Sequence, residues 1–392
     1  MKPVVKILLP LILLGIFCAC GTETGTPLPD QESLGINSSP VLGVTFKKLF
    51  AGADYNCGIA SDGALWCWGS NGSGQLGDGT SADRNQPVKI GNSRKWSSID
   101  CGSYHTCAKK TDNTVWCWGS NQYGQLGNGT TVNQKSPVKI GKADDWASVS
   151  AGERHTCARK SNRTIWCWGS NAGGQLGDGS TADHKKPHQV GKANNWASIS
   201  AGYFHNCAKK TDRTLWCWGQ GKYGQIGDGN FQAVYAPKKI TKAKNWASVS
   251  AGDVHTCAKK TDRSLYCWGN NMGQLGDGTT ATRGVPTKVL AAANWATVSA
   301  GRNQTCANKP DATIWCWGWN YFGQLGLGNN DTKKVPTQVG TDTDWASIMT
   351  GSNHACARKK NGTVYCWGYN LYGQVGNADN TDVNSPVPLS FP

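Results

Sequence analysis

Short stretches of apolar, aromatic and β-branched residues alternate with polar, glycine-rich stretches along most of the chain. In one unit, three such stretches lie at 146–151, 155–160 and 164–169, and a fourth begins at Pro187 after a long polar loop. Runs of this length and composition predict β-strands joined by turns. A proline suits the start of a strand or a sheet edge. We find no amphipathic helical stretch of useful length.

The same unit occurs seven times, with a spacing of 50 residues that is shortened once to 49. A fixed period of this size is typical of repeat architectures. Four short strands in each of seven units predict an all-β fold, a seven-bladed β-propeller of four-stranded antiparallel blades over residues 44–392. The first and last segments match the first and fourth strands of a unit. We therefore expect the two termini to meet in one blade and close the ring.

Each unit contains two cysteines ten positions apart, which accounts for 14 of the 17 cysteines. If the second and third strands form a hairpin, the two cysteines face each other with Cα atoms roughly 4.5–5.5 Å apart, within reach of a disulfide. Each bridge closes a short loop and contributes on the order of 2–3 kcal/mol. The predicted disulfides join Cys57 with Cys67, Cys107 with Cys117, Cys157 with Cys167, Cys207 with Cys217, Cys257 with Cys267, Cys306 with Cys316, and Cys356 with Cys366.

Paired cysteines at this density indicate an oxidising compartment. Zinc binding is the competing interpretation, but zinc ligands prefer two to four intervening residues, and nine intervene here. Cys101 has no partner in the repeat pattern, and we expect it to be a small buried residue.

The N-terminus has the pattern of an export signal. Lys2 and Lys6 precede an apolar run at 7–17, which is too short to cross a bilayer as a helix. Phe-Cys-Ala-Cys at 17–20 resembles the lipobox of bacterial lipoproteins, whose cysteine is lipidated. This resemblance implies a signal peptide at 1–19, a lipid anchor on Cys20, a flexible linker at 20–43 and a place in the bacterial cell envelope, at the outer membrane or cell surface. Ordinary cleavage and secretion is the alternative.

Several short motifs recur in each unit. They are Trp-Cys-Trp-Gly at 166–169, Asn171, Gly-Gln-Leu-Gly at 174–177 followed by Asp-Gly, and Ala-Gly-x-x-His-Thr at 151–156. This combination resembles the regulator of chromosome condensation repeat. The resemblance implies a seven-bladed propeller that serves mainly to bind proteins. Members of that family include a nucleotide exchange factor, a plant photoreceptor and a secreted β-lactamase inhibitor, so the fold alone does not fix a function.

The formal charge of the chain is +15, and much of it is predicted to lie at one end of the propeller. The turns between the second and third strands would form this basic end. It could attract an anionic glycan, a lipid surface or an acidic protein. Alternatively, the charges simply solvate an exposed surface, and the sequence does not favour nucleic acid as a partner. The basic residues are Lys109, Lys110, Arg159, Lys160, Arg163, Lys209, Lys210, Arg213, Lys259, Lys260, Arg263, Lys309, Arg358, Lys359 and Lys360.

Histidine is the residue type that most invites a catalytic or metal-binding interpretation. Five histidines recur in the Ala-Gly-x-x-His motif, and we interpret them as hydrogen-bonding within their own blades. His184 and His188 lie in one non-helical segment on either side of Pro187, and we do not expect a metal site there. The sequence contains no nucleophile elbow, HExxH motif or phosphate loop. We therefore expect no cofactor and no bound metal.

The sequence thus favours a non-catalytic binding scaffold of the cell envelope, with a protein or an anionic glycan or lipid as its partner. Residues that differ between the long loops would supply specificity, and Phe231 and Tyr235 are candidate aromatic anchors. An envelope enzyme, such as a polysaccharide hydrolase or lyase, is the first alternative. An inhibitor of a secreted enzyme is the second.

Overall fold

The computed structural model describes residues 44–290 and 294–392. The predicted signal peptide at 1–19, the lipidation site Cys20 and the linker at 20–43 lie outside the described residues. Among the residues that are described, no helix is long and apolar enough to cross a membrane.

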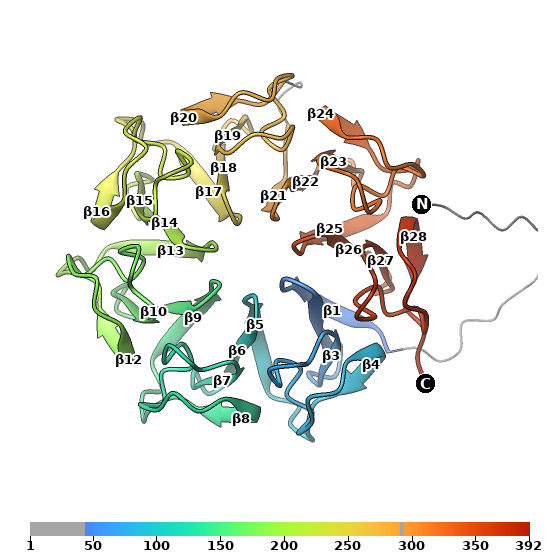
Figure 1. Ribbon diagram of the computed structural model, residues 1–392, viewed down its shortest axis with the longest axis horizontal. Helices are drawn as coiled ribbons and strands as arrows, with labels where there is room; N and C mark the ends of the chain where they lie inside the picture. The colour runs from blue at the N-terminus through green and yellow to red at the C-terminus, as the bar shows by residue number, and fades with distance from the viewer. Residues whose placement is uncertain (1–43, 291–293) are drawn as a thin grey trace, which may run out of the picture. The chain divides into compact units, whose positions relative to one another are not determined.

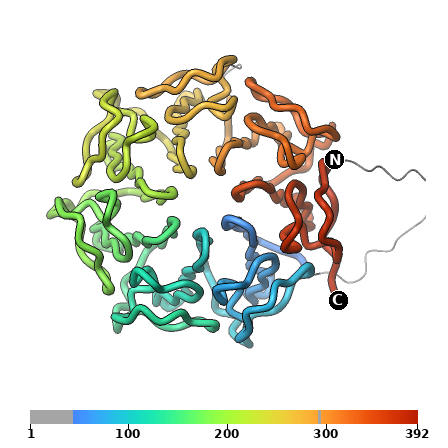
Figure 2. The backbone as a smooth tube through the Cα atoms, viewed as in Figure 1, coloured from blue at the N-terminus to red at the C-terminus, as the bar shows by residue number. Residues whose placement is uncertain are grey.

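Seven separate four-stranded antiparallel sheets surround a central axis (Figures 1 and 2), which confirms the predicted seven-bladed propeller. The innermost strands, which line the axis, are β1 (Phe46–Ala51), β5 (Trp96–Cys101), β9 (Trp146–Ala151), β13 (Trp196–Ala201), β17 (Trp246–Ala251), β21 (Thr297–Ala300) and β25 (Trp345–Thr350). The second strands are β2 (Tyr55–Ala60), β6 (His105–Lys110), β10 (His155–Lys160), β14 (His205–Lys210), β18 (His255–Lys260), β22 (Gln304–Asn308) and β26 (His354–Lys359).

The third strands, which carry the Trp-Cys-Trp-Gly motif, are β3 (Leu65–Gly69), β7 (Val115–Gly119), β11 (Ile165–Gly169), β15 (Leu215–Gly219), β19 (Leu265–Gly269), β23 (Ile314–Gly318) and β27 (Val364–Gly368). The outermost strands are β4 (Arg84–Lys89), β8 (Gln134–Lys139), β12 (His184–Gln189), β16 (Val234–Lys239), β20 (Arg283–Lys288), β24 (Lys333–Gln338) and β28 (Val383–Pro388). The recurring proline lies inside the outermost strand rather than at its start. An edge strand tolerates it there because one side of that strand needs no ladder partner.

The seam between the first and last blades differs from the prediction in one respect. Each blade is built from four consecutive strands, so β1 and β28 belong to different sheets and the termini do not share a blade. The ring closes instead through contacts between the first blade (β1–β4) and the last (β25–β28), which are blades 1 and 7 when the blades are numbered in chain order. The Phe46 amide donates to the carbonyl of Gly362 (3.0 Å). The Phe391 ring lies 6.3 Å from the Phe46 ring and 6.0 Å from Trp66.

All seven predicted disulfides are present, and each links the second and third strands of one blade. In blade 3 the two cysteines pair directly in the β10–β11 ladder, with Cα atoms 4.1 Å apart. This separation is slightly shorter than the range expected from the sequence. The bridges join Cys57 to Cys67, Cys107 to Cys117, Cys157 to Cys167, Cys207 to Cys217, Cys257 to Cys267, Cys306 to Cys316, and Cys356 to Cys366.

Cys101 is free and buried, as expected. Burial raises the pKa of its thiol, and the nearby charge of Asp100 raises it further, which keeps the group protonated.

A hydrogen bond from a buried tryptophan links each blade to the blade before it. Gln75, in the Gly-Gln-Leu-Gly loop of blade 1, offers its backbone carbonyl to Nε1 of Trp118 (2.9 Å) and to the Thr106 hydroxyl (2.7 Å). A Cβ on Gly77 would lie 2.6 Å from that indole nitrogen, so the motif requires glycine there. The seven indole–carbonyl distances are 2.9–3.1 Å, for Trp68 with Gln374, Trp118 with Gln75, Trp168 with Gln125, Trp218 with Gln175, Trp268 with Gln225, Trp317 with Gln274, and Trp367 with Gln324.

The recurring histidines also bond between blades, which corrects our interpretation that they bond within their own. His105 Nε2 contacts the Thr156 hydroxyl of the next blade (2.8 Å), and His354 Nε2 contacts Asn56 Oδ1 across the seam (2.9 Å). The reason is that the first residue of the second strand faces the neighbouring sheet. Burial lowers the pKa of His105 to about 3 and that of His155 to about 4, so both are neutral at physiological pH.

A lysine at the end of the second strand, or directly after it in blade 6, covers an aromatic pair in six of the seven blades. Lys110 Nζ lies 3.9 Å from the centre of the Trp116 ring and 4.9 Å from that of Trp96. This arrangement is a cation–π contact. Blade 1 has Ala60 at this position instead. The six lysines and their rings are Lys110 (Trp96, Trp116), Lys160 (Trp146, Trp166), Lys210 (Trp196, Trp216), Lys260 (Trp246, Tyr266), Lys309 (Trp295, Trp315) and Lys359 (Trp345, Tyr365).

This contact gives a stability prediction. Lys110→Met keeps most of the apolar stem and removes the cation, so it should lower the free energy of unfolding by about 1 kcal/mol. Lys142→Met is the matched control, because Lys142 is exposed in the connection that follows the same blade. It should change stability by less than about 0.5 kcal/mol. Urea denaturation with the disulfides intact measures both. Equal losses for the two variants would show that the rings do not stabilise the lysine.

Candidate functional site

The antiparallel order of strands gives the propeller two different faces. The loop face carries the turns after the innermost strands and the long loops before the outermost strands. The turn face carries the hairpin turns between the second and third strands and the connections between blades. The predicted basic residues belong to the turn face, and the predicted anchors Phe231 and Tyr235 belong to blade 4, in its long loop and in β16.

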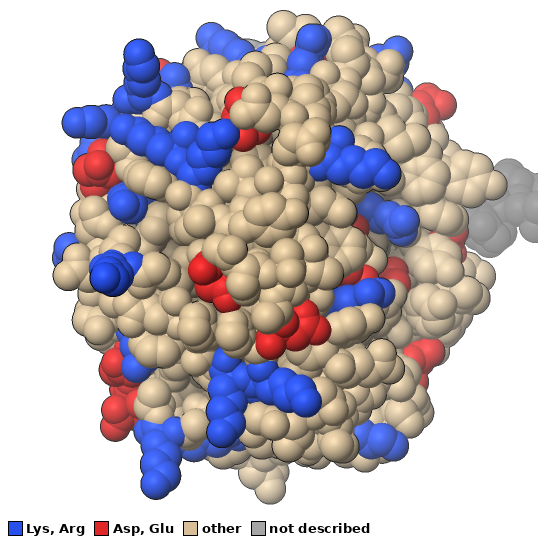
Figure 3. Space-filling view, turned by 60° about the vertical axis from the view of Figure 1, so that its left-hand side comes forward, with Lys and Arg blue, Asp and Glu red and all other residues tan. Residues whose placement is uncertain are grey.

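Many of the basic residues on the turn face already have partners within the protein. Besides the lysines over aromatic rings, Lys209 Nζ donates to the carbonyl of Ala247 (2.6 Å), and Lys259 donates to that of Ala296. Arg358 donates to the adjacent carbonyl of Lys359 (3.2 Å). On the side of the molecule shown in Figure 3, blue Lys and Arg side chains lie in separate groups divided by uncharged and acidic surface. The exposed members of the predicted set include Arg163, Arg213, Arg263 and Lys360.

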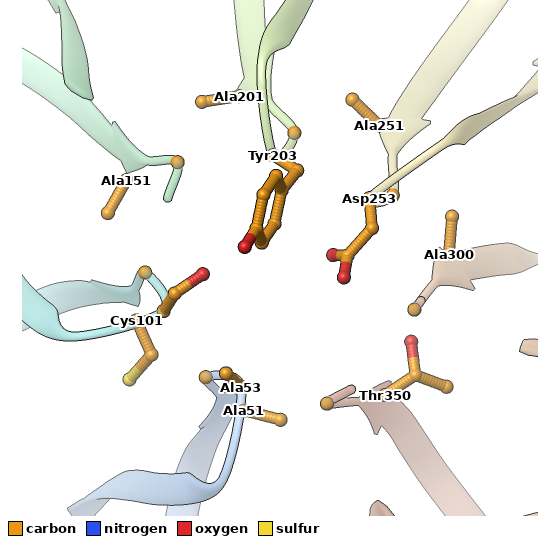
Figure 4. A pocket seen from close by; sticks show the side chains of 18 of the residues that line it. Ala51, Ala53, Cys101, Ala151, Ala201, Tyr203, Ala251, Asp253, Ala300 and Thr350 are labelled. Carbon is orange, nitrogen blue, oxygen red and sulfur yellow. The ribbon is translucent and has the colours of Figure 1, made fainter. Parts of the chain in front are cut away.

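The centre of the ring is a cavity of about 190 Å³, lined mainly by small residues of the innermost strands and of the turns that follow them. One position of each turn, directly after the recurring glycine, differs between blades. Figure 4 shows Tyr203 and Asp253 from this position pointing into the opening, among alanines such as Ala151, Ala201 and Ala251. We call these seven residues the channel mouth: Ala53, Ser103, Glu153, Tyr203, Asp253, Arg302 and Ser352.

The channel mouth carries perturbed carboxyl groups. Burial raises the pKa of Asp253 to about 7; the charge of Arg302 opposes this rise, and Glu153 and Asp54 add to it. Burial also raises the pKa of Glu153, against the opposing influences of Tyr203 and Arg154. Glu153 is only 1% exposed.

The two oxygens of Glu153 differ in their contacts. Oε1 lies 3.2 Å from Nε of Arg154, whereas Oε2 has no hydrogen-bond partner. The phenol of Tyr203 lies near enough to affect the pKa of Glu153, but no hydrogen bond of good geometry joins that phenol to Oε2.

A group of aromatic side chains lies on the loop face of blades 6 and 7. The rings of Trp319 and Tyr321 stack nearly parallel with centres 5.9 Å apart, and Phe322 meets Trp319 edge-on at 5.4 Å. Phe322 also contacts Tyr369 of the next blade, with ring centres 4.8 Å apart. Tyr321 is 67% exposed. We define the aromatic patch as Trp319, Tyr321, Phe322, Tyr369, Leu371 and Tyr372.

At the position directly after Trp-Cys-Trp-Gly or Tyr-Cys-Trp-Gly, an aromatic residue occurs only in blades 6 and 7. Ser70, Ser120 and Ser170 occupy the positions that Trp319 and Tyr369 occupy in blades 6 and 7. Sequence reasoning missed this patch because it looked for unusual residues within the longest loops. Comparing the seven units directly after Trp-Cys-Trp-Gly would have revealed it.

Asp54, next to Ala53 of the channel mouth, affects titratable groups of both the aromatic patch and the channel mouth. The charge of Asp54 contributes to the raised pKa of Tyr369 and to that of Asp253, although burial is the main cause in both cases.

The predicted anchors lie elsewhere on the ring. Phe231 and Tyr235 are 42% and 43% exposed on blade 4, and neither belongs to the aromatic patch. Their role in binding stays a prediction, as does that of the basic residues.

The family of the chain follows from two models, both described as the regulator of chromosome condensation (RCC1) repeat. One matches residues 62–108, 112–159, 164–208, 213–258, 262–307, 311–358 and 361–392. The other matches residues 46–75, 96–125, 146–175, 196–225, 246–274 and 345–374. The chain belongs to the RCC1 repeat family. Among curated proteins, no sequence matches it.

Several solved structures share the fold at low sequence identity. Prp20p from Saccharomyces cerevisiae, studied for its binding to Gsp1p and histones, is 22% identical with a TM-score of 0.74; the match covers 88% of this chain and 87% of that one. Human WBSCR16 is 21% identical with a TM-score of 0.75, over 84% and 94% of the two chains. The ectodomain of the Physcomitrella patens receptor kinase CR4 is 20% identical with a TM-score of 0.54, over 83% and 74%. These likenesses support the fold alone.

The raised pKa of Asp253 predicts a pH-dependent effect of Asp253→Asn. Between about pH 4 and pH 7, Asp253 loses its proton in the unfolded chain but keeps it in the folded chain. The free energy of unfolding of the wild type therefore falls as the pH rises through this window. The variant should match the wild type at pH 4 and be more stable at pH 8, by on the order of 2 kcal/mol. Thermal unfolding at both pH values measures this.

Asp78→Asn is the control of opposite sign. Despite burial, bonds from Thr80 and Arg84 lower the pKa of Asp78, so its stabilising effect is present at neutral pH and is lost on acidification. This variant should be less stable than the wild type at pH 8. An Asp253→Asn protein that is no more stable than the wild type at pH 8 would contradict the raised pKa.

Proposed function

We propose that this chain is an exported, non-catalytic scaffold that binds a protein partner through the aromatic patch and channel mouth on its loop face. The observation that carries the proposal is the aromatic patch itself, because six apolar or aromatic side chains on neighbouring blades remain partly exposed, and two of them, Trp319 and Tyr369, replace polar residues of the sister blades. Exposed apolar groups that gather in one place mark interaction surfaces. Tryptophan and tyrosine supply much of the binding energy at such surfaces.

The family supports a protein as the partner. RCC1-type propellers bind proteins, and the yeast relative is described by its binding to Gsp1p and histones. A glycan or a lipid surface would use the turn face instead, and many of its charges are already paired within the blades. We therefore place the partner on the loop face.

The compartment forms part of the proposal. Seven disulfides persist in an oxidising environment, which supports export. The lipobox-like sequence at 17–20 supports anchoring of the exported protein through Cys20 to the bacterial envelope. Inhibition of a secreted enzyme would be one form of such protein binding.

Hydrolysis of a polysaccharide is the second candidate function. The raised pKa values of Asp253 and Glu153 favour it, because glycosidases use a pair of carboxyl groups as acid and base. Two observations weigh against it. Glu153 is only 1% exposed, so a substrate cannot reach it without a rearrangement. The cavity of about 190 Å³ is also smaller than ligand pockets, which usually begin at about 300 Å³.

Partner capture tests the binding proposal. The purified protein, with its disulfides intact, is used to capture proteins from the envelope fraction of its source, and the affinity for the captured protein is then measured. Replacing Trp319 and Tyr321 together by alanine should weaken binding at least about tenfold, because buried aromatic anchors each contribute more than about 1 kcal/mol. Raising the salt concentration should change the affinity little.

The matched control replaces Val132 and Tyr223 by alanine, since both are exposed residues in the long loops of other blades. This variant should keep the wild-type affinity. If the control loses as much affinity as the patch variant, or if replacing Arg163, Arg213 and Arg263 by glutamine abolishes binding, the partner does not use the aromatic patch. Release of sugars from envelope polysaccharide that is abolished by Asp253→Asn would establish the enzymatic alternative instead.

A further inference from the structure

Blade 3 contains a cluster of side chains that its sister blades lack. Asp178 belongs to the Asp-Gly turn that follows Gly-Gln-Leu, and its Oδ1 atom accepts bonds from the Ser180 amide (2.9 Å) and from Asn171 Nδ2 (3.1 Å). The Ser180 hydroxyl donates to the same carboxylate, at 2.9 Å from Oδ1 and 3.1 Å from Oδ2, and Oδ2 faces the outermost strand. His184 Nε2 lies 2.8 Å from Oδ2. The His188 ring stacks on the His184 ring with centres 4.2 Å apart and planes 5° apart.

Sister blades show what this position usually does. The equivalent aspartates pair with one cation, which is Arg84 on Asp78 (2.7 Å) and Arg283 on Asp277 (2.8 Å). In blade 4 the cation is Lys238, which occupies the position of His188 rather than that of His184 and lies 2.7 Å from Asp228. Both positions can therefore reach the carboxylate, and only blade 3 fills both with imidazoles. Two histidines are not needed to form the turn.

An irregular register brings the histidines together. Cys167 pairs with His188 and Gly169 pairs with His184, so four residues along β12 match two along β11. In a regular strand, residues four apart would be separated by about 13 Å. This register explains why sequence reasoning expected no metal site at His184 and His188, and why it overlooked Asp178.

We propose that Asp178, His184 and His188 form a binding site for one divalent transition-metal ion, of which Zn²⁺ is the probe. One ligand atom from each residue lies within 4.8 Å of the other two. Bonds of about 2.0–2.1 Å in a tetrahedral zinc site place ligand atoms about 3.3 Å apart. His188 is exposed, so its ring can rotate out of the stack and close this gap. His184 Nε2 and Asp178 Oδ2, which are 2.8 Å apart, need to separate by only about 0.5 Å. The metal replaces the proton between His184 Nε2 and Asp178 Oδ2.

The donor set indicates the class of metal. Two imidazoles and one carboxylate suit Zn²⁺, Cu²⁺ and Ni²⁺, whereas Ca²⁺ and Mg²⁺ prefer oxygen ligands alone.

The other five of the seven histidines are fully buried and lie between blades. They do not offer a competing site, so one ion per chain is expected.

Isothermal titration of the full chain with ZnCl₂, after chelator treatment and with the disulfides intact, tests the site. We expect one Zn²⁺ per chain, with no competition from Mg²⁺. His188→Val and His184→Arg should each weaken binding by at least about tenfold, because each removes a ligand. Both variants should fold, since sister blades have Val88 and Arg84 at these positions. Unchanged thermal stability of the metal-free variants checks this.

The proposal can also be tested by building a second metal site into the chain. Blade 1 has the same irregular register, with Gly69 opposite Arg84 and Cys67 opposite Val88. Replacing Arg84 and Val88 together by histidine should raise the stoichiometry from one Zn²⁺ to two. Wild-type affinity in His188→Val, binding spread over several weak sites, or no heat of binding for the wild type would each overturn the proposal.

Discussion

The hydrogen bonds between blades are the constraint on which the rest of the structure depends. Each Gly-Gln-Leu-Gly loop places a backbone carbonyl where the buried indole of the next blade can donate to it, and glycine is required because a Cβ would collide with that indole. A buried carbonyl or N–H without a partner costs about 1–3 kcal/mol, so no blade is complete without its neighbour. The bond from Trp68 to Gln374 falls within the range of the others. The ring therefore closes on itself without a blade shared by the two termini.

Interactions within a blade have a different role. The disulfide and the lysine over its aromatic pair both join residues of one blade, so they stabilise the unit before it meets its neighbours. The lysine contacts also explain why the large positive charge of the chain is a poor guide to function. A lysine that covers two aromatic rings is already engaged in the fold, and its recurrence from unit to unit reflects packing. Arg163, Arg213 and Arg263, which are exposed, are the better measure of the charge available to a partner.

The repeated part of the fold could be predicted from the sequence because each local rule applies seven times. The pairing of Cys157 with Cys167, the hairpin that places it and the number of blades all follow from the period and from strand geometry. The partner of His105 could not be predicted, because a strand pattern gives the face on which a side chain lies but not which sheet approaches that face. The cluster at His184 and His188 depends on a register shift between β11 and β12, which cannot be recognised from the residues of the loop. The aromatic residues of the patch were visible in the sequence, but their closeness depends on how blades 6 and 7 meet.

In a chain of near-identical units, the shared residues describe the scaffold, so information about function lies in the differences. The turn after each innermost strand shows this clearly: the glycine is constant, whereas the next residue is Ala53, Glu153, Asp253 or Arg302 in different blades. Sevenfold packing cannot account for such variety, since every blade offers this position the same backbone. A partner that sits over the axis meets six of these positions at once, since only Glu153 is buried, and it meets the aromatic patch on one side only. Such a surface fixes the rotation of the partner about the ring as well as its identity, which a symmetric ring of charges could not do.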